Sequence, residues 1–152
     1  MNKTAIYNNL INFMQQYVEN EKRITEEARN SAAQLPGRNE TRYDSLRTEN
    51  GWVVNGMSKR TNELETQLSI ARAFRLNLNL SEITEGSYVK LKSGQNPKDY
   101  FILPFFGGME IEGDQEFMII TPDAPIFNEM FGRKKGESFS FRGKDYEVLD
   151  II

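Results

Sequence analysis

Residues 121–152, at the C-terminal end of the chain, read TPDAPIFNEMFGRKKGESFSFRGKDYEVLDII and decide the fold. Pro125 suits the first turn of a helix, because its missing N–H would have no partner there, and Gly132 can end that helix. Two runs of β-favouring residues follow, 138–141 and 146–151, on either side of a polar turn. This stretch therefore predicts one short helix followed by a β-hairpin.

The β pattern continues upstream. Short runs of β-branched and aromatic residues are separated by glycine, proline and asparagine, which predicts strands at 88–91, 99–103 and 116–120. Together with the C-terminal stretch, residues 82–152 are predicted to form a small β-rich domain with one helix.

The front of the chain instead repeats its apolar residues at helical spacing. Between residues 4 and 35 the steps are three, four and seven, as in a coiled-coil seam. The predicted seam consists of Ile6, Leu10, Phe13, Tyr17, Ile24, Ala28 and Leu35. Pro36 and Gly37 end this helix, and a second helical pattern covers about residues 41–74.

Two long helices joined by a short turn can only pair back on one another. Residues 1–78 are therefore predicted to be an antiparallel coiled-coil hairpin with its tip at about residues 36–44. The predicted class is α+β: a helical hairpin, a boundary near residues 75–81, and the β-rich domain.

The composition limits the chemistry available to the chain. The 152 residues include no Cys and no His, which excludes disulfides, thiolate and imidazole catalysis, and typical zinc sites. Carboxylates without His favour hard ions such as Mg²⁺, usually shared with a partner's oxygen atoms. The net charge of −3, with no dense Lys/Arg block, argues against a purely DNA-binding role. The N-terminus has neither a signal-peptide pattern nor a membrane-spanning run, so we expect a cytoplasmic protein without a membrane partner.

Several motifs in the C-terminal half occur in the order found in the Gre family of bacterial transcript-cleavage factors. They are Thr121-Pro122, Ala124-Pro125, the apolar helix 126–131, Gly132-Arg133-Lys134-Lys135-Gly136-Glu137 and Tyr146-Glu147-Val148-Leu149-Asp150-Ile151. Upstream, Gly86-Ser87-Tyr88-Val89-Lys90-Leu91 is similar to the strand that opens the same domain in that family. The chain thus resembles the Gre family over about residues 82–152.

This resemblance implies an FKBP-like C-terminal domain that docks on bacterial RNA polymerase beside its secondary channel. It also implies that the coiled coil enters the channel, where acids at its tip help the polymerase bind a second Mg²⁺ and cleave the 3′ end of backtracked RNA. The protein would be an accessory factor and not an enzyme, would bind no Mg²⁺ by itself, and is expected to be a monomer. The expected polymerase-docking residues are Thr121, Pro122, Asp123, Ala124, Pro125, Ile126 and Phe127.

The tip departs from the family pattern. Gre factors usually carry an acidic-Leu-Ser-Glu-Asn motif there, whereas residues 35–44 read LPGRNETRYD. Counting back from 63–65, which resembles the family's Glu-Leu-acidic segment, assigns Glu40 and Asp44 as the catalytic, metal-holding acids. Their i, i+4 spacing can place both on one helix face. The alternative is that Glu40 belongs to a helix-start signal and that Asp44 is a solvated surface residue.

Two arginines near these acids are candidates for RNA contacts. Arg42 and Arg47 could bind phosphates near the RNA 3′ end, or could simply be ion-pair partners on a wet helix. The arginine-rich tip keeps open a second function, a Gre-fold polymerase binder that does not promote cleavage.

An alternative from another class is an FKBP-like peptidyl-prolyl isomerase or chaperone. Its pocket would be lined by Phe101, Phe105, Phe106, Phe117, Phe139 and Phe141. The same side chains are what a small β core needs, because alternate positions of a strand point inward.

Overall fold

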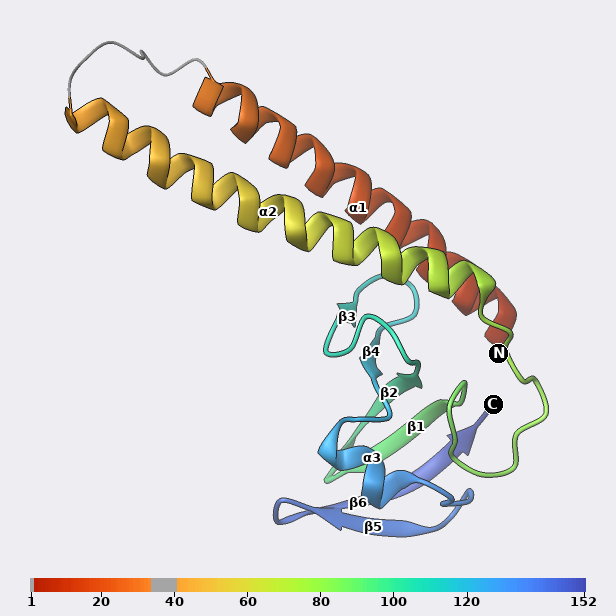
Figure 1. Cartoon of the computed structure of the whole chain (residues 1–152). Coiled ribbons are helices and arrows are strands. Elements are labelled where there is room, and N and C mark those ends of the chain that lie inside the picture. Colours follow the sequence, from red (N-terminus) through yellow and green to blue (C-terminus); the bar gives the residue numbers. More distant parts are fainter. Residues whose placement is uncertain (1, 34–40) are drawn as a thin grey trace. The chain divides into compact units, whose positions relative to one another are not determined.

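The structure is a computed structural model that describes the backbone of residues 2–33 and 41–152, and side chains within 2–31 and 55–152. The helices are α1 (Lys3–Ala33), α2 (Thr41–Ala73) and α3 (Pro125–Met130) (Figure 1). The strands are β1 (Tyr88–Ser93), β2 (Asn96–Ile102), β3 (Glu110–Ile111), β4 (Phe117–Ile120), β5 (Ser138–Phe141) and β6 (Lys144–Ile151). The α+β class is as predicted, and no helix within the described ranges is long and apolar enough to cross a membrane.

The chain divides into two compact units. One contains Ile11–Arg72, and the other contains Met1–Leu10 together with Ala73–Ile152. The first ten residues, which the sequence assigned to a hairpin over 1–78, therefore pack with the β-rich part of the chain.

The first unit is a pair of antiparallel helices. Contacts join Gln15 to Arg72, Lys22 to Glu65, and Arg29 to Ser58, so α2 steps back seven residues for every seven that α1 advances. This is the heptad register expected of an antiparallel coiled coil. Among the described side chains of this unit, the buried ones are Met14, Val18 and Thr25 of α1 and Thr61, Leu64, Leu68 and Ala71 of α2.

The predicted seam of α1 is wrong in part. Phe13 and Ile24 are 38% and 37% exposed, whereas Met14 and Val18 are buried. Leu10, Met14 and Val18 follow one another in steps of four, and such steps stay close to one face of a helix with 3.6 residues per turn. The aromatic rings of Phe13 and Tyr17 lie beside that face and stack on each other 6.4 Å apart.

The second unit is built on a mixed sheet with the strand order β3-β4-β2-β1-β6-β5. Every neighbouring pair is antiparallel except β2 and β4, which run parallel. The predicted C-terminal hairpin is present, with Phe141 opposite Lys144. Its turn is shorter than predicted because Arg142 and Gly143 both have positive φ angles, 48° and 77°, as a two-residue type I′ turn requires.

The two faces of this sheet bury different side chains. One face carries Val89, Leu91, Ile102, Ile120 and Val148, which form one apolar cluster with Phe127 and Met130 of α3. The other face is aromatic: the rings of Tyr88, Phe101 and Phe117 meet edge to face at 5.3–5.8 Å. The short helix α3 thus seals one side of the sheet.

Residues 3–10, in the first turns of α1, pack against the aromatic face of the sheet. The Tyr7 ring lies 6.0 Å from that of Phe101 and 6.5 Å from that of Phe105, and Phe74 meets Phe105 at 5.6 Å. Four residues earlier, the buried Lys3 ammonium donates hydrogen bonds to the carbonyl oxygens of Asn77 and Gly86, the latter at 3.0 Å. The N-terminal turns of α1 are therefore an integral part of this unit.

Candidate functional site

The predicted catalytic tip lies mostly beyond the described side chains. Glu40 is outside the described residues. Arg42, Asp44 and Arg47 lie in the first turns of α2, which begins at Thr41, and their side chains are outside the described part. Whether Glu40 and Asp44 share one face stays a prediction.

The register of the two helices shows where these residues lie relative to the end of α1. Continuing the pairing of Arg29 with Ser58 places Val54 opposite Ala33, the last residue of α1. The α2 backbone from Thr41 up to that level therefore extends beyond α1 (Figure 1). Arg42, Asp44 and Arg47 lie in this part of α2.

The predicted docking segment is a turn that leads into α3. The carbonyl of Thr121 accepts a hydrogen bond from the N–H of Ala124 at 3.0 Å, and the carbonyl of Ala124 accepts one from Phe127 at 3.0 Å. Pro125 occupies the start of the helix, where its missing N–H leaves no bond unmade. A Cβ at Gly107 would lie 2.7 Å from the Thr121 methyl carbon, so only glycine allows the two segments to approach this closely.

The side chains of this segment divide into exposed and buried sets. Asp123 and Pro125 are exposed, while Ile126 is half-buried against the apolar cluster. Phe127 is only 9% exposed and belongs to the core, so it cannot present the apolar surface that a docking role requires.

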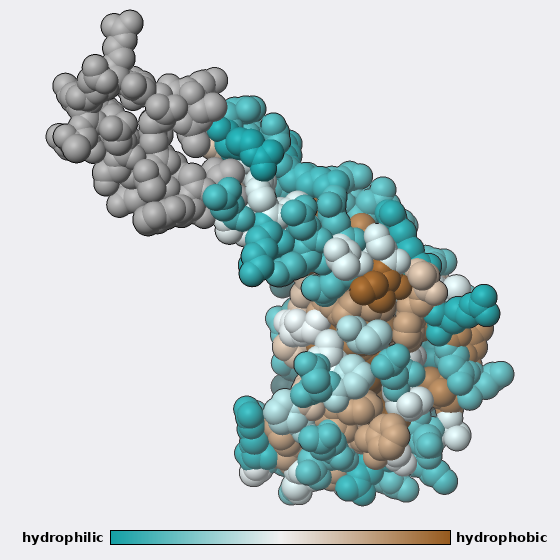
Figure 2. Space-filling view, viewed as in Figure 1, coloured by the Kyte–Doolittle hydropathy of each residue, from teal (hydrophilic) through white to brown (hydrophobic). Residues whose placement is uncertain are grey.

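The exposed aromatic of this region is Phe131, which sequence reasoning missed. Its side chain is 59% exposed, and its ring rests 5.5 Å from that of Phe127. Its place four residues after Phe127 could have predicted the ring contact, since side chains at i and i+4 meet on a helix, but it does not predict the exposure. Figure 2 shows apolar surface on the unit containing Ala73–Ile152, among polar residues. We call the three exposed residues Asp123, Pro125 and Phe131 the candidate docking surface. They supply a carboxylate, a rigid proline ring and an aromatic ring.

A polar pocket lies elsewhere in the same unit. It has a volume of about 660 Å³ and is lined by residues of β1, β2, β3 and β4 and by the loop between β3 and β4, with Glu110, Glu112, Asp114 and Glu116 among them. The Tyr88 hydroxyl donates to Asp99 Oδ2 at 2.8 Å, and Gln115 Nε2 donates to both Tyr88 and Asp99. Burial, with the bond to Asp99, raises the pKa of Tyr88, which keeps the phenol protonated as a donor. Within the described ranges no group of three or more acidic side chains is placed to hold a metal ion.

The phenylalanines of the isomerase alternative do not gather around this pocket. Phe117 is the member of the set that lines it. Phe101, Phe105, Phe106 and Phe139 are at most 5% exposed, and Phe141 packs against the apolar cluster beneath the Arg142 guanidinium. These rings fill both sides of the sheet.

No protein-family model and no curated protein matches the chain. Three similar solved structures are described as the GreA factor homolog 1 (Gfh1) protein of Thermus thermophilus, the transcription factor Gfh1, and Thermus aquaticus Gfh1. Their identities to this chain are 16%, 20% and 17%, and their TM-scores are 0.39, 0.39 and 0.38. The alignments cover 93%, 93% and 92% of this chain and 94%, 92% and 92% of the others. Likenesses at this level establish neither the family nor the function of the chain.

Proposed function

We propose that this chain is a Gre-like accessory factor of bacterial RNA polymerase, with an FKBP-like docking domain and a helical hairpin that enters the secondary channel. The observation that carries the proposal is the motif series of residues 121–151. It forms one continuous set of elements, the Thr121 turn, α3, and the β5–β6 hairpin, in a chain that also has two antiparallel helices of 31 and 33 residues. Such a factor would work in the cytoplasm, as a monomer.

The proposed activity is stimulation of RNA cleavage by the polymerase. Glu40 and Asp44 would supply anionic oxygens to a Mg²⁺ ion shared with the polymerase active site. Mg²⁺ prefers six oxygen ligands, so two carboxylates require the polymerase, the RNA and water to complete its coordination. The ion, when bound, lowers the pKa of an attacking water. The first turns of α2 would carry Asp44, and Arg42 and Arg47 of the same turns would hold the RNA 3′ end through its phosphates.

An RNA-cleavage assay on a stalled, backtracked elongation complex tests this function. Wild-type protein is expected to shorten the RNA, whereas Glu40→Gln and Asp44→Asn are each expected to abolish that stimulation. An amide keeps the size of the side chain but loses the charge that attracts the ion. Both variants should still compete with wild-type protein for polymerase, because docking is assigned to the other unit. Stimulation that persists in both variants would contradict the roles of these acids.

A second candidate is a polymerase binder that occupies the channel without promoting cleavage. The alternation of Arg38, Arg42 and Arg47 with acids, in place of the family's acidic tip motif, favours it. Wild-type protein that binds polymerase and yet stimulates no cleavage at any Mg²⁺ concentration would establish this candidate over the first.

A further inference from the structure

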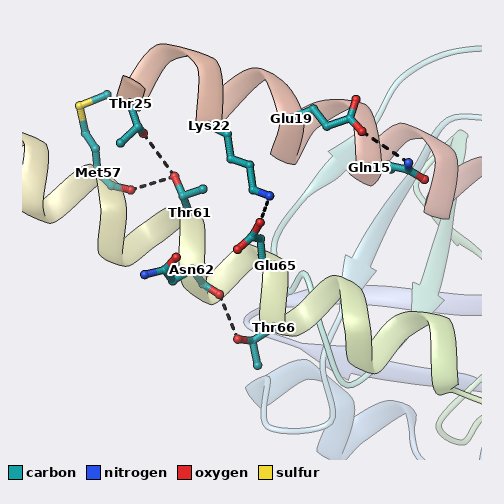
Figure 3. Close-up of polar contacts among 9 residues, drawn as sticks. All are labelled: Gln15, Glu19, Lys22, Thr25, Met57, Thr61, Asn62, Glu65 and Thr66. Atoms are coloured by element: carbon teal, nitrogen blue, oxygen red, sulfur yellow. Dashed lines mark hydrogen bonds and ion pairs between the residues drawn. The ribbon is translucent and has the colours of Figure 1, made fainter. Parts of the chain in front are cut away.

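Two threonines interrupt the buried seam of the helical hairpin. Thr25 of α1 and Thr61 of α2 are each 6% exposed, and their hydroxyl oxygens lie 3.4 Å apart across the helix pair (Figure 3). The other buried side chains in the described part of this unit are apolar. We call Thr25 and Thr61 the threonine layer.

The threonine layer holds the helices together weakly. A threonine hydroxyl has one proton to donate. Thr25 donates it to the carbonyl of Glu21 at 2.8 Å, and Thr61 donates its own to the carbonyl of Met57 at 2.9 Å. A hydrogen bond between the two hydroxyls would therefore require one of them to give up its bond to the carbonyl of its own helix. The layer adds neither an independent hydrogen bond between the helices nor the apolar burial of a normal seam position.

The two sides of the threonine layer differ in how the helices are joined. On the side toward Arg72, the seam buries Met14, Val18, Leu64 and Leu68. Lys22 and Glu65 also form an ion pair there, next to the layer (Figure 3). The seam on this side therefore has the apolar burial that drives helix association.

On the side toward Ala33, the described side chains bury less apolar surface. Ala28 and Met57 are only half-buried, and the helices are joined by exposed hydrogen bonds, from Arg29 to Ser58 at 2.9 Å and from Arg60 back to the Tyr17 hydroxyl at 3.4 Å. Exposed polar contacts contribute little to stability. In addition, Gly56 lies inside α2, where glycine is unfavourable by about 1 kcal/mol relative to alanine.

We infer that the threonine layer divides the hairpin into two cooperative parts. The proximal part, residues 11–24 with 62–72, stays closed while the distal part, residues 26–33 with 55–60, opens and closes as a separate unit. The layer is the point at which opening stops. Local opening of this kind follows the sections of a fold with the least buried apolar contact. The inference concerns the helix pair itself and holds whatever the chain binds.

Hydrogen exchange of backbone amides in the full-length protein tests this division. We expect distal amides to exchange faster than proximal ones, with an abrupt change at residues 25 and 61. Simple fraying would instead give a gradual decrease in rate away from the end of α1. A gradual profile, or equal rates on both sides of the layer, would overturn the inference without any variant.

The double variant Thr25→Val/Thr61→Val supplies the second test. Valine keeps the side-chain shape but replaces each hydroxyl by a methyl group that the seam can bury. Distal exchange is expected to slow by about tenfold, and the step in rate at the layer should shrink.

Thr66→Val is the matched control. Thr66 donates to the carbonyl of Asn62 at 3.0 Å in the same i, i−4 manner, but its side chain is exposed (Figure 3). It should leave distal exchange unchanged. Slowing that is equal in the control and the double variant, or absent from the double variant, would show that burial of these hydroxyls does not set the opening.

Discussion

Gly56 and Gly107 contrast two uses of glycine in this chain. A Cβ added at Gly56 meets nothing within 4 Å, and the residue lies inside α2. Gly56→Ala is therefore expected to raise the free energy of unfolding of the hairpin by about 1 kcal/mol, because alanine loses less conformational entropy in a helix. Chemical denaturation followed by circular dichroism measures this change.

Gly107→Ala is the comparison for that experiment. Its new Cβ would lie 2.7 Å from the methyl carbon of Thr121, so the variant should be destabilised. A loss of stability in Gly56→Ala, or a gain in Gly107→Ala, would contradict the packing described at these two positions.

Lys3 and Tyr7 give the β-rich unit a predictable dependence on pH. Burial lowers the pKa of Lys3 from 10.5 to about 8 and raises that of Tyr7 from 10.0 to about 12. Between pH 8 and 10 the unfolded chain holds a proton on Lys3 that the folded chain has lost, so stability rises with pH. Above pH 10 the folded chain keeps the Tyr7 proton that the unfolded chain loses, so stability falls. Unfolding free energies measured by denaturant titration should pass through a maximum near pH 10.

Lys3→Met isolates the lysine part of this profile. The variant keeps an unbranched apolar stem but cannot titrate, so the rise between pH 8 and 10 should disappear while the fall above pH 10 remains. The rise in wild-type protein is at most about 3 kcal/mol, the value that a pKa difference of this size allows. A rise of equal size in Lys3→Met would assign it to another group.

At the scale of the element, α3 contains one buried aromatic residue, Phe127, and is followed by an exposed one, Phe131. Phe127 belongs to the apolar cluster, so Phe127→Ala should lower the unfolding free energy by about 3–5 kcal/mol. Phe131 is 59% exposed, and Phe131→Ser should change stability by less than about 1 kcal/mol. If the candidate docking surface binds polymerase, Phe131→Ser should nevertheless weaken binding by about tenfold, as loss of an aromatic anchor typically does. Thermal melts and a polymerase pull-down titration measure the two effects. Unchanged binding by a folded Phe131→Ser variant would remove Phe131 from the docking surface.

Elements with local signals were predictable from the sequence. Pro125 and Gly132 predict α3 because each acts on its own backbone, and the β5–β6 hairpin follows from two strands close together in the chain. The seam of α1 was predicted one residue off at Phe13 because apolar spacing alone does not distinguish Phe13 from Met14. Which of the two is buried depends on where α2 packs, and that is a tertiary property.

Candidate site residues were predictable only where a motif marks them. The docking turn from Thr121 follows from the resemblance, whereas the exposure of Phe131 depends on how α3 packs on the sheet. The network of Tyr88, Asp99 and Gln115 joins residues up to 27 positions apart, and no spacing rule connects them. Glu40 and Asp44 stay predictions.

At the scale of the whole molecule, the sequence could not show that the N-terminus belongs to the β-rich unit. The seam residues Ile6 and Leu10 continue the helical pattern of α1 without a break, so composition gives no boundary there. The assignment depends instead on contacts of Lys3 and Tyr7 with residues more than 65 positions away. Parallel pairing of β2 with β4 is similarly non-local. Such contacts are set by tertiary packing and leave no periodic signal.

A fragment of residues 82–152, which the sequence predicts to be a domain, lacks Tyr7 and Phe74, whose rings contact Phe101 and Phe105. Removing them exposes one side of the sheet to water. The fragment is therefore expected to melt more than about 10 °C below a fusion of residues 1–10, a glycine-serine linker and residues 73–152, because a loss of a few kcal/mol shifts Tm by that much in a domain of this size. Calorimetry of the two proteins makes the comparison. Equal melting temperatures would show that the N-terminal turns do not contribute to the stability of the β-rich unit.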